Sequence, residues 1–255
     1  MPVTATARPR GSQEVRHPAR AIRHAFIITL FLALSGLPAF PASAQMSAAV
    51  SLFSDLRFRG YSLSDGRPVG ILDLSYDAPS GFYGALSGSV VASRDEGPKP
   101  LGLILNGGYA RQVSPHMSLD IGVTHSSYST YSDRAASLSY TEAYAGISGK
   151  LVSARLNISP DYVKGGSAYG EVNANLPLAR TLSFTAHAGL VVPFKEVHSG
   201  YTYSRDIDWK LGLAKLLGPV SLQAAWTGVR PGREDIYRER NHRRDAFIIG
   251  LTYSL

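Results

Sequence analysis

Residues 47–255 follow one rhythm, in which stretches of roughly ten residues alternate apolar and polar side chains. The segments ARLNISPDY and AFIIGLTYSL are examples. A period of two places the apolar side chains of a strand on one face and the polar ones on the other. Strands of this length that are apolar on one side are typical of transmembrane barrels, where one face meets lipid and the other faces the lumen. The pattern therefore predicts an all-β, antiparallel transmembrane β-barrel.

The barrel is predicted to have about twelve strands, joined alternately by short turns and longer polar connections. Proline and glycine mark short turns such as 79–81, 114–116 and 218–219. Outer-membrane barrels have short periplasmic turns and long external loops, so an even strand number puts both chain ends in the periplasm. The expected strands are residues 47–59, 68–78, 82–93, 101–113, 117–128, 137–148, 150–159, 168–176, 181–194, 205–216, 220–229 and 245–255.

The first 44 residues have the order of a secretory signal peptide. Five arginines precede the apolar run AFIITLFLAL, and the small-residue segment ASA ends at Ala44. The apolar run is too short to span a bilayer as a helix, which needs about 20 residues. We therefore expect a cleaved signal peptide at 1–44 and a single barrel domain at 45–255.

The composition narrows the possible functions. The expected leader holds five arginines and one glutamate, so it carries more than half of the formal net charge of +7, and nucleic-acid binding has little support. The chain has no cysteine, which excludes disulfides and thiolate metal sites. The sequence patterns of phosphate-binding loops, zinc proteases and calcium loops are absent, so no cofactor or metal is expected.

A soluble β-sandwich or a lipocalin-like barrel would also alternate apolar and polar residues. The number of strands, the tyrosine-rich strand ends and the last strand favour the membrane barrel. Outer-membrane proteins usually end in a strand of the form Gly-x-x-aromatic-x-hydrophobic, and Gly250, Tyr253 and Leu255 match it. We therefore expect outer-membrane lipid around the barrel and recognition of its C-terminal strand by the barrel-assembly machinery.

Several segments resemble the TorF family of proteobacterial outer-membrane proteins, and they cover nearly the whole predicted barrel in order. The resemblance implies an outer-membrane barrel of porin type and brings no substrate with it. The segments are SDLRFRGYSLSDGRP from Ser54, SLDIGVTHSSY from Ser118, YTEAYAGIS from Tyr140, GSAYGEVNANLPL from Gly166 and DWKLGLAKLLGPVSLQAAWT from Asp208.

Parity along each strand predicts which residues face the lumen. In the first predicted strand Leu52 points to lipid, and Arg57 and Arg59 point into the lumen. The opposite register would place arginine in lipid, at ~2–4 kcal/mol each near the midplane. The residues expected to line the pore are Arg57, Arg59, Asp73, Tyr140, Glu142, Tyr144, Arg155, Glu171 and Asp208.

Two interpretations of these lumen residues stay open. Arg57 and Arg59, near the outer mouth, either attract anions or pair with carboxylates that keep the wall rigid. Tyr140, Glu142 and Tyr144 form either a solute-selecting constriction or a packed interior, since twelve strands lie between filled and water-filled barrels. By parity the lumen holds eight acids and four bases, which predicts a mild preference for cations.

The last external connection, at 230–244, is rich in arginine. Guanidinium groups match the geometry of phosphates, so this loop is a candidate for binding lipopolysaccharide. The alternative is a solvated loop whose charges only keep it soluble. The candidate residues are Arg233, Arg238, Arg240, Arg243 and Arg244.

The sequence thus favours a passive outer-membrane channel for small polar solutes, and not an enzyme. The alternative is a structural or binding barrel with a closed lumen and functional external loops. A third hypothesis, a lipid A-modifying enzyme, rests on His125 and Ser127, which parity places toward lipid. The nearest candidate carboxylate, Glu142, faces the lumen by parity, so no catalytic triad is expected there.

Overall fold

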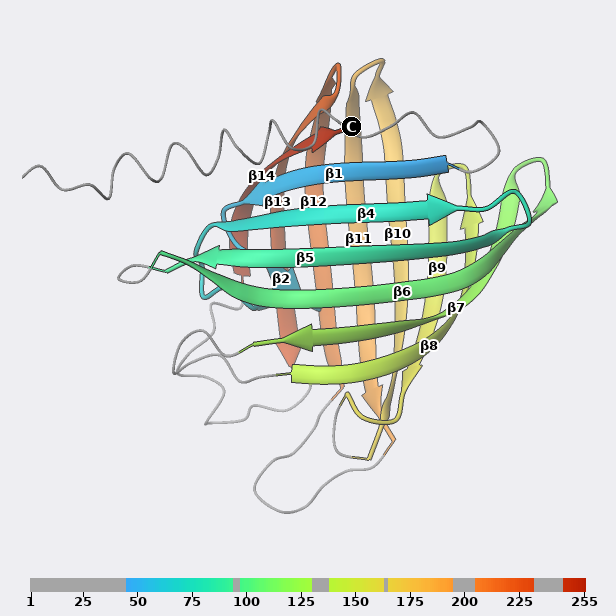
Figure 1. Cartoon of the computed structure of the whole chain (residues 1–255), viewed down its shortest axis with the longest axis horizontal. Helices are drawn as coiled ribbons and strands as arrows, with labels where there is room; N and C mark the ends of the chain where they lie inside the picture. The colour runs from blue at the N-terminus through green and yellow to red at the C-terminus, as the bar shows by residue number, and fades with distance from the viewer. Residues whose placement is uncertain (1–44, 94–96, 130–137, 163–164, 195–204, 232–244) are drawn as a thin grey trace, which may run out of the picture. The chain divides into compact units, whose positions relative to one another are not determined.

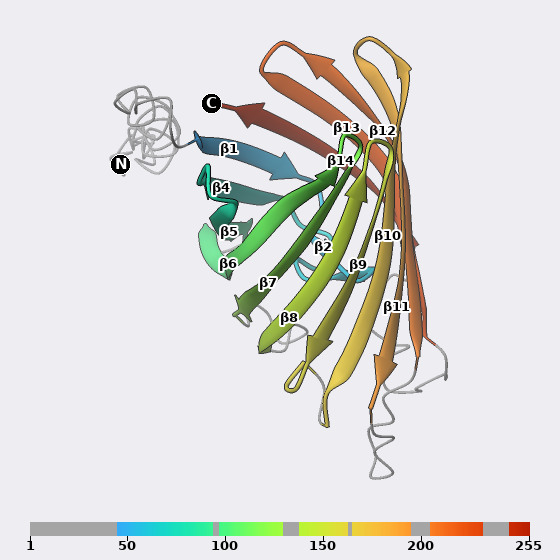
Figure 2. The same ribbon diagram turned by 90° about the vertical axis from the view of Figure 1, so that its right-hand side faces the viewer.

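The computed structural model describes residues 45–93, 97–129, 138–162, 165–194, 205–231 and 245–255. Twelve of its strands form one closed antiparallel barrel, which β1 completes by pairing with both β4 and β14 (Figures 1 and 2). The barrel strands are β1 (Gln45–Phe53), β4 (Val69–Asp77), β5 (Phe82–Ala92), β6 (Pro98–Ser114), β7 (Met117–Tyr128), β8 (Leu138–Gly149), β9 (Val152–Ser159), β10 (Ser167–Ala179), β11 (Leu182–Pro193), β12 (Asp206–Leu217), β13 (Val220–Pro231) and β14 (Asp245–Ser254).

This architecture confirms the predicted fold class. Every expected strand after the first agrees with the structure to within three residues at either end. The expected signal peptide at 1–44 and the arginines of the last connection, 232–244, lie outside the described residues. No helix among the described residues is long and apolar enough to cross a membrane.

The two ends of the barrel differ in their connections (Figure 1). Consecutive strands are joined at one end by turns such as 78–81, 115–116 and 218–219, and the chain enters β1 and leaves β14 at this same end. We call it the tight-turn end. The opposite, long-connection end carries the segments between β1 and β4, β7 and β8, and β13 and β14.

The first strand is the one whose prediction is wrong. It ends at Phe53, and residues 54–68 form a separate hairpin made of β2 (Arg57–Phe58) and β3 (Tyr61–Ser62). Arg59 and Gly60 form its two-residue turn with φ of 48° and 78°, as the tight hairpin turn with two positive φ values requires. Because the hairpin strands also alternate apolar and polar residues, the sequence pattern alone continues the first strand through them.

One carboxylate holds this hairpin together. Asp55 accepts hydrogen bonds from the hydroxyls of Ser62 and Ser64, at 2.5 and 2.8 Å, and from the backbone N–H of Gly66 at 3.2 Å. Its second oxygen accepts a 2.9 Å bond from Arg57. Several polar groups of the hairpin are therefore hydrogen-bonded to each other and do not depend on the barrel wall.

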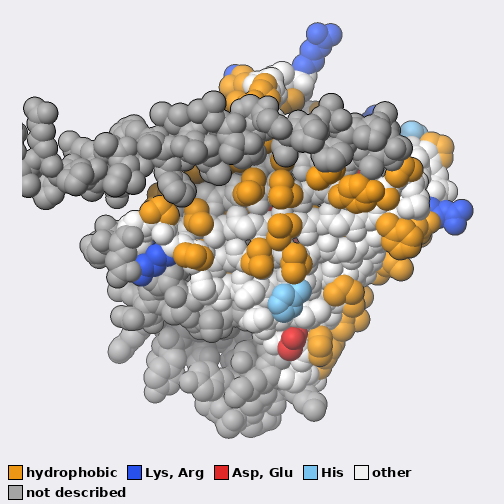
Figure 3. Space-filling view, in the orientation of Figure 1, with side chains coloured by type: hydrophobic (Ala, Val, Ile, Leu, Met, Phe, Trp, Pro, Cys, Tyr) orange, Lys and Arg blue, Asp and Glu red, His pale blue; other side chains and the backbone are white. Residues whose placement is uncertain are grey.

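The barrel exterior is apolar and flanked by aromatic pairs (Figure 3). Leu52 and Ile121, for example, are each 59% exposed on this outer face, whereas Ser51 on the lumen face is 4% exposed. Trp209 contacts Trp226 edge-on toward the long-connection end, and Phe82 contacts Tyr109 in the same way toward the tight-turn end. An apolar band between two aromatic belts is the outer surface of a membrane-spanning barrel.

Candidate functional site

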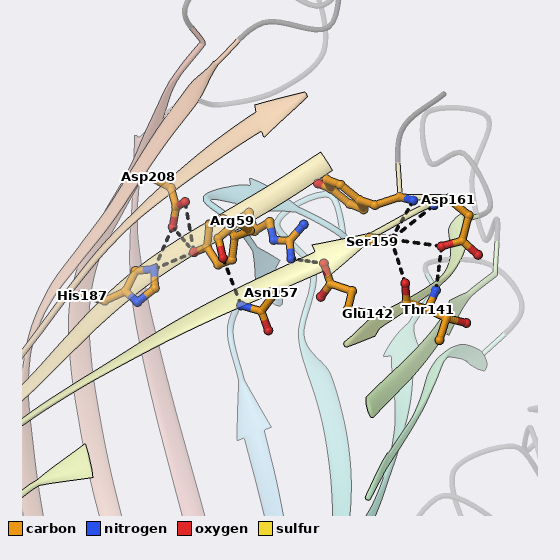
Figure 4. A network of polar contacts seen from close by, with 10 residues as sticks. Arg59, Thr141, Glu142, Asn157, Ser159, Asp161, His187 and Asp208 are labelled. Carbon is orange, nitrogen blue, oxygen red and sulfur yellow. Dashed lines mark hydrogen bonds and ion pairs between the residues drawn. The ribbon is translucent and has the colours of Figure 1, made fainter. Parts of the chain in front are cut away.

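The hairpin 54–68 lies inside the lumen and crosses it toward β8. Its Arg59 donates a 2.5 Å hydrogen bond from Nη2 to Glu142 of β8, and both side chains are more than nine-tenths buried (Figure 4). The guanidinium also lies over the rings of Tyr169 and Tyr162, with Cζ 4.0 and 4.3 Å from their centroids. Such stacking is favourable for a desolvated cation.

Two further contacts seat the hairpin against the wall. Tyr61 donates a 2.8 Å hydrogen bond to Asp206 of β12. Gly60 lies so close to β13 that a Cβ there would stand 2.6 Å from the carbonyl oxygen of Gly228. Glycine is thus required at the tip both by its positive φ and by this close approach.

An apolar contact anchors the other side of the hairpin. Leu56 packs against Val69, Val91 and Leu101, which are almost completely buried on the inner wall of β4, β5 and β6. Phe58 adds an aromatic layer, with its ring 5.7 Å from that of Tyr140. Packed side chains of the hairpin and the wall therefore narrow the long-connection end of the lumen.

A cavity of about 490 Å³ adjoins the hairpin and extends along the inner faces of β7 to β14. Its lining combines apolar and aromatic side chains such as Ile104 and Phe58 with charged groups of both signs, amides and hydroxyls that can bind polar solutes. The polar lining includes Ser126, Arg155, Asn157, Glu171, Asn173, His187, Asp208, Lys210, Gln223 and Thr227.

Glycines let large side chains lie flat against this part of the wall. A Cβ on Gly122 would stand 2.3 Å from the hydroxyl oxygen of Tyr144, and one on Gly189 would stand 2.1 Å from that of Tyr169. Both glycines occupy lumen-facing positions next to the strand that carries the tyrosine. The rings therefore cover neighbouring strands rather than projecting to the barrel axis, which leaves room for the cavity.

The predicted residue Arg155 belongs to a cluster on this wall. It donates a 2.9 Å hydrogen bond to Asp120 and lies over the ring of Tyr144, with Cζ 4.3 Å from the centroid. The hydroxyl of Tyr144 contacts that of Tyr83 on β5. Gly146 makes the ion pair possible, since a Cβ there would stand 2.1 Å from an Asp120 oxygen.

A second cluster is centred on His187, which the sequence analysis did not single out. Its Nε2 lies 2.8 Å from an oxygen of Asp208 (Figure 4). Its Nδ1 lies 2.7 Å from the side-chain oxygen of Asn173. Glu171 lies 3.7 Å from Nδ1, and the Tyr169 hydroxyl lies 3.1 Å from Nε2. Lumen parity along β11 was a signal that could have identified this histidine.

The predicted pore-lining residues are thus divided between two places, and their role in a pore stays a prediction. Tyr140, Glu142, Tyr144, Arg155, Glu171 and Asp208 all lie on the lumen face of the barrel, as expected. Asp73 is also on that face, in a separate cavity of about 210 Å³ near the tight-turn end.

Arg57 and Arg59 are the exceptions, because they sit on the hairpin and not on β1. Both pair with carboxylates, Arg57 with Asp55 and Arg59 with Glu142. The ion pairs of the second interpretation are thus present, whereas the attraction of anions stays a prediction.

The lipid-facing pair His125 and Ser127 lies on the outer face of β7. His125 is exposed and its Nδ1 lies 3.0 Å from the hydroxyl oxygen of Thr141. Glu142 is on the opposite face of β8, buried against Arg59. Among the described residues, no group of three or more histidine and acidic side chains is arranged to hold a metal ion.

A family model for bacterial proteins of unknown function, Gcw_chp, matches residues 39–250. The chain belongs to this family. The match does not carry the TorF name, which stays an interpretation of the sequence segments. A comparison with curated proteins gives no match.

Solved structures with a similar fold include two porins. The NanC porin has a TM-score of 0.54 at 9% identity, over 83% of this chain and 100% of that one. The KdgM porin has a TM-score of 0.52 at 13% identity, over 82% of this chain and 99% of that one. At such identities the likeness shows the fold, which is that of a porin-like barrel.

Proposed function

We propose that the protein is an outer-membrane channel through which small polar solutes diffuse passively. The observation that carries the proposal is the cavity of about 490 Å³, with charged and hydrogen-bonding groups in its lining, inside a closed barrel whose exterior is apolar. Such a barrel needs no chemistry to move solutes, because the lining sets the diameter and the field while a concentration difference drives the flux.

The hairpin is the selective element of the proposed channel. It occupies the lumen at the long-connection end, so solutes must pass beside its tip before they reach the cavity. The Arg59–Glu142 pair fixes the tip, and the surrounding aromatic rings limit the space. This arrangement favours small solutes that can exchange hydrogen bonds with amides and hydroxyls.

Single-channel recording of purified protein in a planar bilayer tests the proposal, together with liposome swelling in neutral sugars of increasing size. We expect discrete conductance steps and swelling that falls off with sugar size. Well-folded protein, shown by heat-modifiable migration, that gives neither conductance nor swelling would remove the channel proposal.

A closed barrel that works through its external loops is the second candidate. The observation that favours it is the contact of the tip residue Gly60 with Gly228 and Val229 of β13, which adds to the pair with β8. This candidate predicts that the wild-type protein is silent and that conductance appears only after the hairpin is removed. The same recordings therefore separate the two candidates.

We assign no catalytic activity to the barrel. A lipid A-modifying site at His125 and Ser127 would need a carboxylate to orient the histidine, and the position beside His125 on β8 is taken by Thr141. Mass spectrometry of lipid A from cells with and without the protein checks this assignment. A change in acylation that the His125→Ala variant abolishes would contradict it.

A further inference from the structure

The two ends of the barrel differ in their acidic residues, whereas basic residues such as Arg230 and Lys215 lie at both ends. Near the tight-turn end the charged residues of the outer surface are all basic: Arg111 on β6, Lys150 in the β8–β9 turn, Arg180 in the β10–β11 turn and Lys215 on β12. We call these four residues the basic arc. All four are exposed, and none has an ion-pair or hydrogen-bond partner among the described residues.

Acidic residues that do not line the barrel wall lie at the other end, the long-connection end. Among the described residues, Asp161 and Asp245 are the acids outside the lumen, Asp65 lies on the hairpin, and all three are at the long-connection end. Asp77 is near the tight-turn end, but it follows the lumen-facing parity of Asp73 on β4, opposite to the outward Leu74 and Tyr76. Leu255 follows β14, which lies two strands away from β12 in the barrel, so this residue is not beside the basic arc.

Each member of the arc stands beside an exposed leucine. Arg111 pairs across strands with Leu119, and Lys215 with Leu222. The two turn residues adjoin leucines in sequence, namely Leu151 next to Lys150 and Leu178 two residues before Arg180. Leu119, Leu178 and Leu222 are 41% to 60% exposed on the outer face of the barrel, and Leu151 is 42% exposed in the turn.

These surroundings are typical of a lysine or arginine at the interface between the apolar core of a membrane and water. The aliphatic stem of lysine or arginine lies along apolar surface while its charged head reaches the interface. The aromatic pair Phe82–Tyr109 marks the same boundary on the neighbouring strands. Figure 3 shows basic side chains projecting at the top and right of the view, where the tight turns of Figure 1 lie.

We propose that the basic arc binds the headgroups of anionic phospholipids. Unpaired cations at the edge of an apolar band, with no acid beside them, complement a phosphodiester headgroup whose acyl chains lie along the leucines. The binding places the tight-turn end in the phospholipid leaflet of the membrane, and it does not depend on whether the lumen conducts.

The test is native mass spectrometry of the protein released from nanodiscs that contain equal amounts of phosphatidylglycerol and phosphatidylcholine. We expect the wild type to retain phosphatidylglycerol in excess, by about fivefold per occupied site, which corresponds to roughly 1 kcal/mol per cation. The variant Arg111→Gln/Lys150→Gln/Arg180→Gln/Lys215→Gln should retain both lipids equally. High salt should weaken the preference of the wild type, since exposed charges are screened.

Lys210→Gln is the matched control, because Lys210 lies on the same strand as Lys215 but lines the lumen cavity. It should leave the lipid preference unchanged. If the fourfold variant fails to assemble, the pairs Arg111→Gln/Lys150→Gln and Arg180→Gln/Lys215→Gln should each lose about half of the preference, because the proposed sites are separate.

Two results would overturn the proposal. One is an undiminished preference for phosphatidylglycerol in the assembled variants. The other is a stronger retention of lipopolysaccharide than of phosphatidylglycerol that the same substitutions abolish, since this would assign the arc to the lipopolysaccharide leaflet.

Discussion

The hairpin and the cavity wall both contain tyrosines and paired charges, but these residues have opposite effects on the open space of the lumen. In the hairpin, Arg59 and Phe58 project across the lumen and are packed by Tyr140 and Tyr162. On the wall, Tyr144 and its neighbours lie flat over glycines. The difference shows that the position of glycine decides whether an aromatic side chain fills a lumen of this size or lines it.

The two regions also differ in how completely their polar groups are satisfied. Of the Arg59 guanidinium, Nη2 reaches Glu142, but Nε and Nη1 have no hydrogen-bond partner among the described residues. By contrast, Asp208 on the wall receives bonds from Tyr169 and His187. A buried cation with unsatisfied N–H groups lowers stability. We therefore expect the contacts that hold the hairpin against the wall to be less stable than the contacts within the wall.

The largest expected effect comes from removing the hairpin. Replacing residues 55–66 by a short Gly-Ser linker should raise single-channel conductance several-fold, because it clears the long-connection end of the lumen. The barrel should still close, since the β1–β4 ladder uses only Gln45–Phe53 and Val69–Asp77. Heat-modifiable migration monitors folding, and an unchanged conductance in the folded variant would place the barrier to flow in the wall.

Filling a wall glycine should have the next largest effect. Gly189→Leu forces Tyr169 and Asp208 away from the strand, so we expect a loss of ~1–3 kcal/mol of stability and a lower conductance. Gly170→Leu is the control, because a Cβ on Gly170, which faces outward on β10, meets no atom within 4 Å. Equal effects of the two substitutions on denaturation and conductance would show that the flat packing of Tyr169 over Gly189 determines neither stability nor conductance.

Breaking the ion pair should release the hairpin. Glu142→Ala leaves Arg59 buried and unpaired, which costs ~3–5 kcal/mol if the hairpin stays seated. We therefore expect an added Leu63→Cys thiol to react faster with a maleimide in the Glu142→Ala background. The chain has no other cysteine, so labelling reports this position alone.

Glu171→Ala serves as the control for that experiment, because Glu171 bonds to wall residues such as Asn173. It should leave the labelling rate unchanged. Equal rates in the wild type and in both variants would mean that the Arg59–Glu142 pair does not hold the hairpin.

The smallest expected effect concerns ion selectivity. Three of the expected lumen acids pair with arginine, whereas Asp73, Glu171 and Asp208 line the lumen cavities together with Lys210. We expect a mild cation preference that Glu171→Gln shifts by a few millivolts toward anions in a KCl gradient, since permeating ions pass within a Debye length of ~8 Å. Asp245→Asn, outside the lumen, should produce no shift.

The sequence predicted the barrel because each strand carries its own evidence. In β14, Phe247, Ile249 and Leu251 alternate with lumen-facing residues, and all three are exposed on the outer face as expected. The same parity placed Glu142 and Arg155 in the lumen. These predictions needed only the period of two and the cost of placing a charge in lipid.

The hairpin could not be predicted in this way. Its residues satisfy the same period of two, and its turn has Arg59 at positive φ, which is unusual for a residue with a side chain. The pairing of Arg59 with Glu142 joins residues 83 positions apart in the sequence. Only the closed barrel brings these side chains together.

The internal bonding of the hairpin through Asp55 has an evolutionary consequence. The Asp55 carboxylate accepts hydrogen bonds from Arg57, Ser62, Ser64 and Gly66. These bonds lie within the hairpin, so its conformation is held by its own residues. A substitution or an insertion within 54–68 alters what blocks the lumen while the barrel ladders stay intact. In the proposed channel, such changes would alter permeability and leave the strands that hold the barrel in the membrane unchanged.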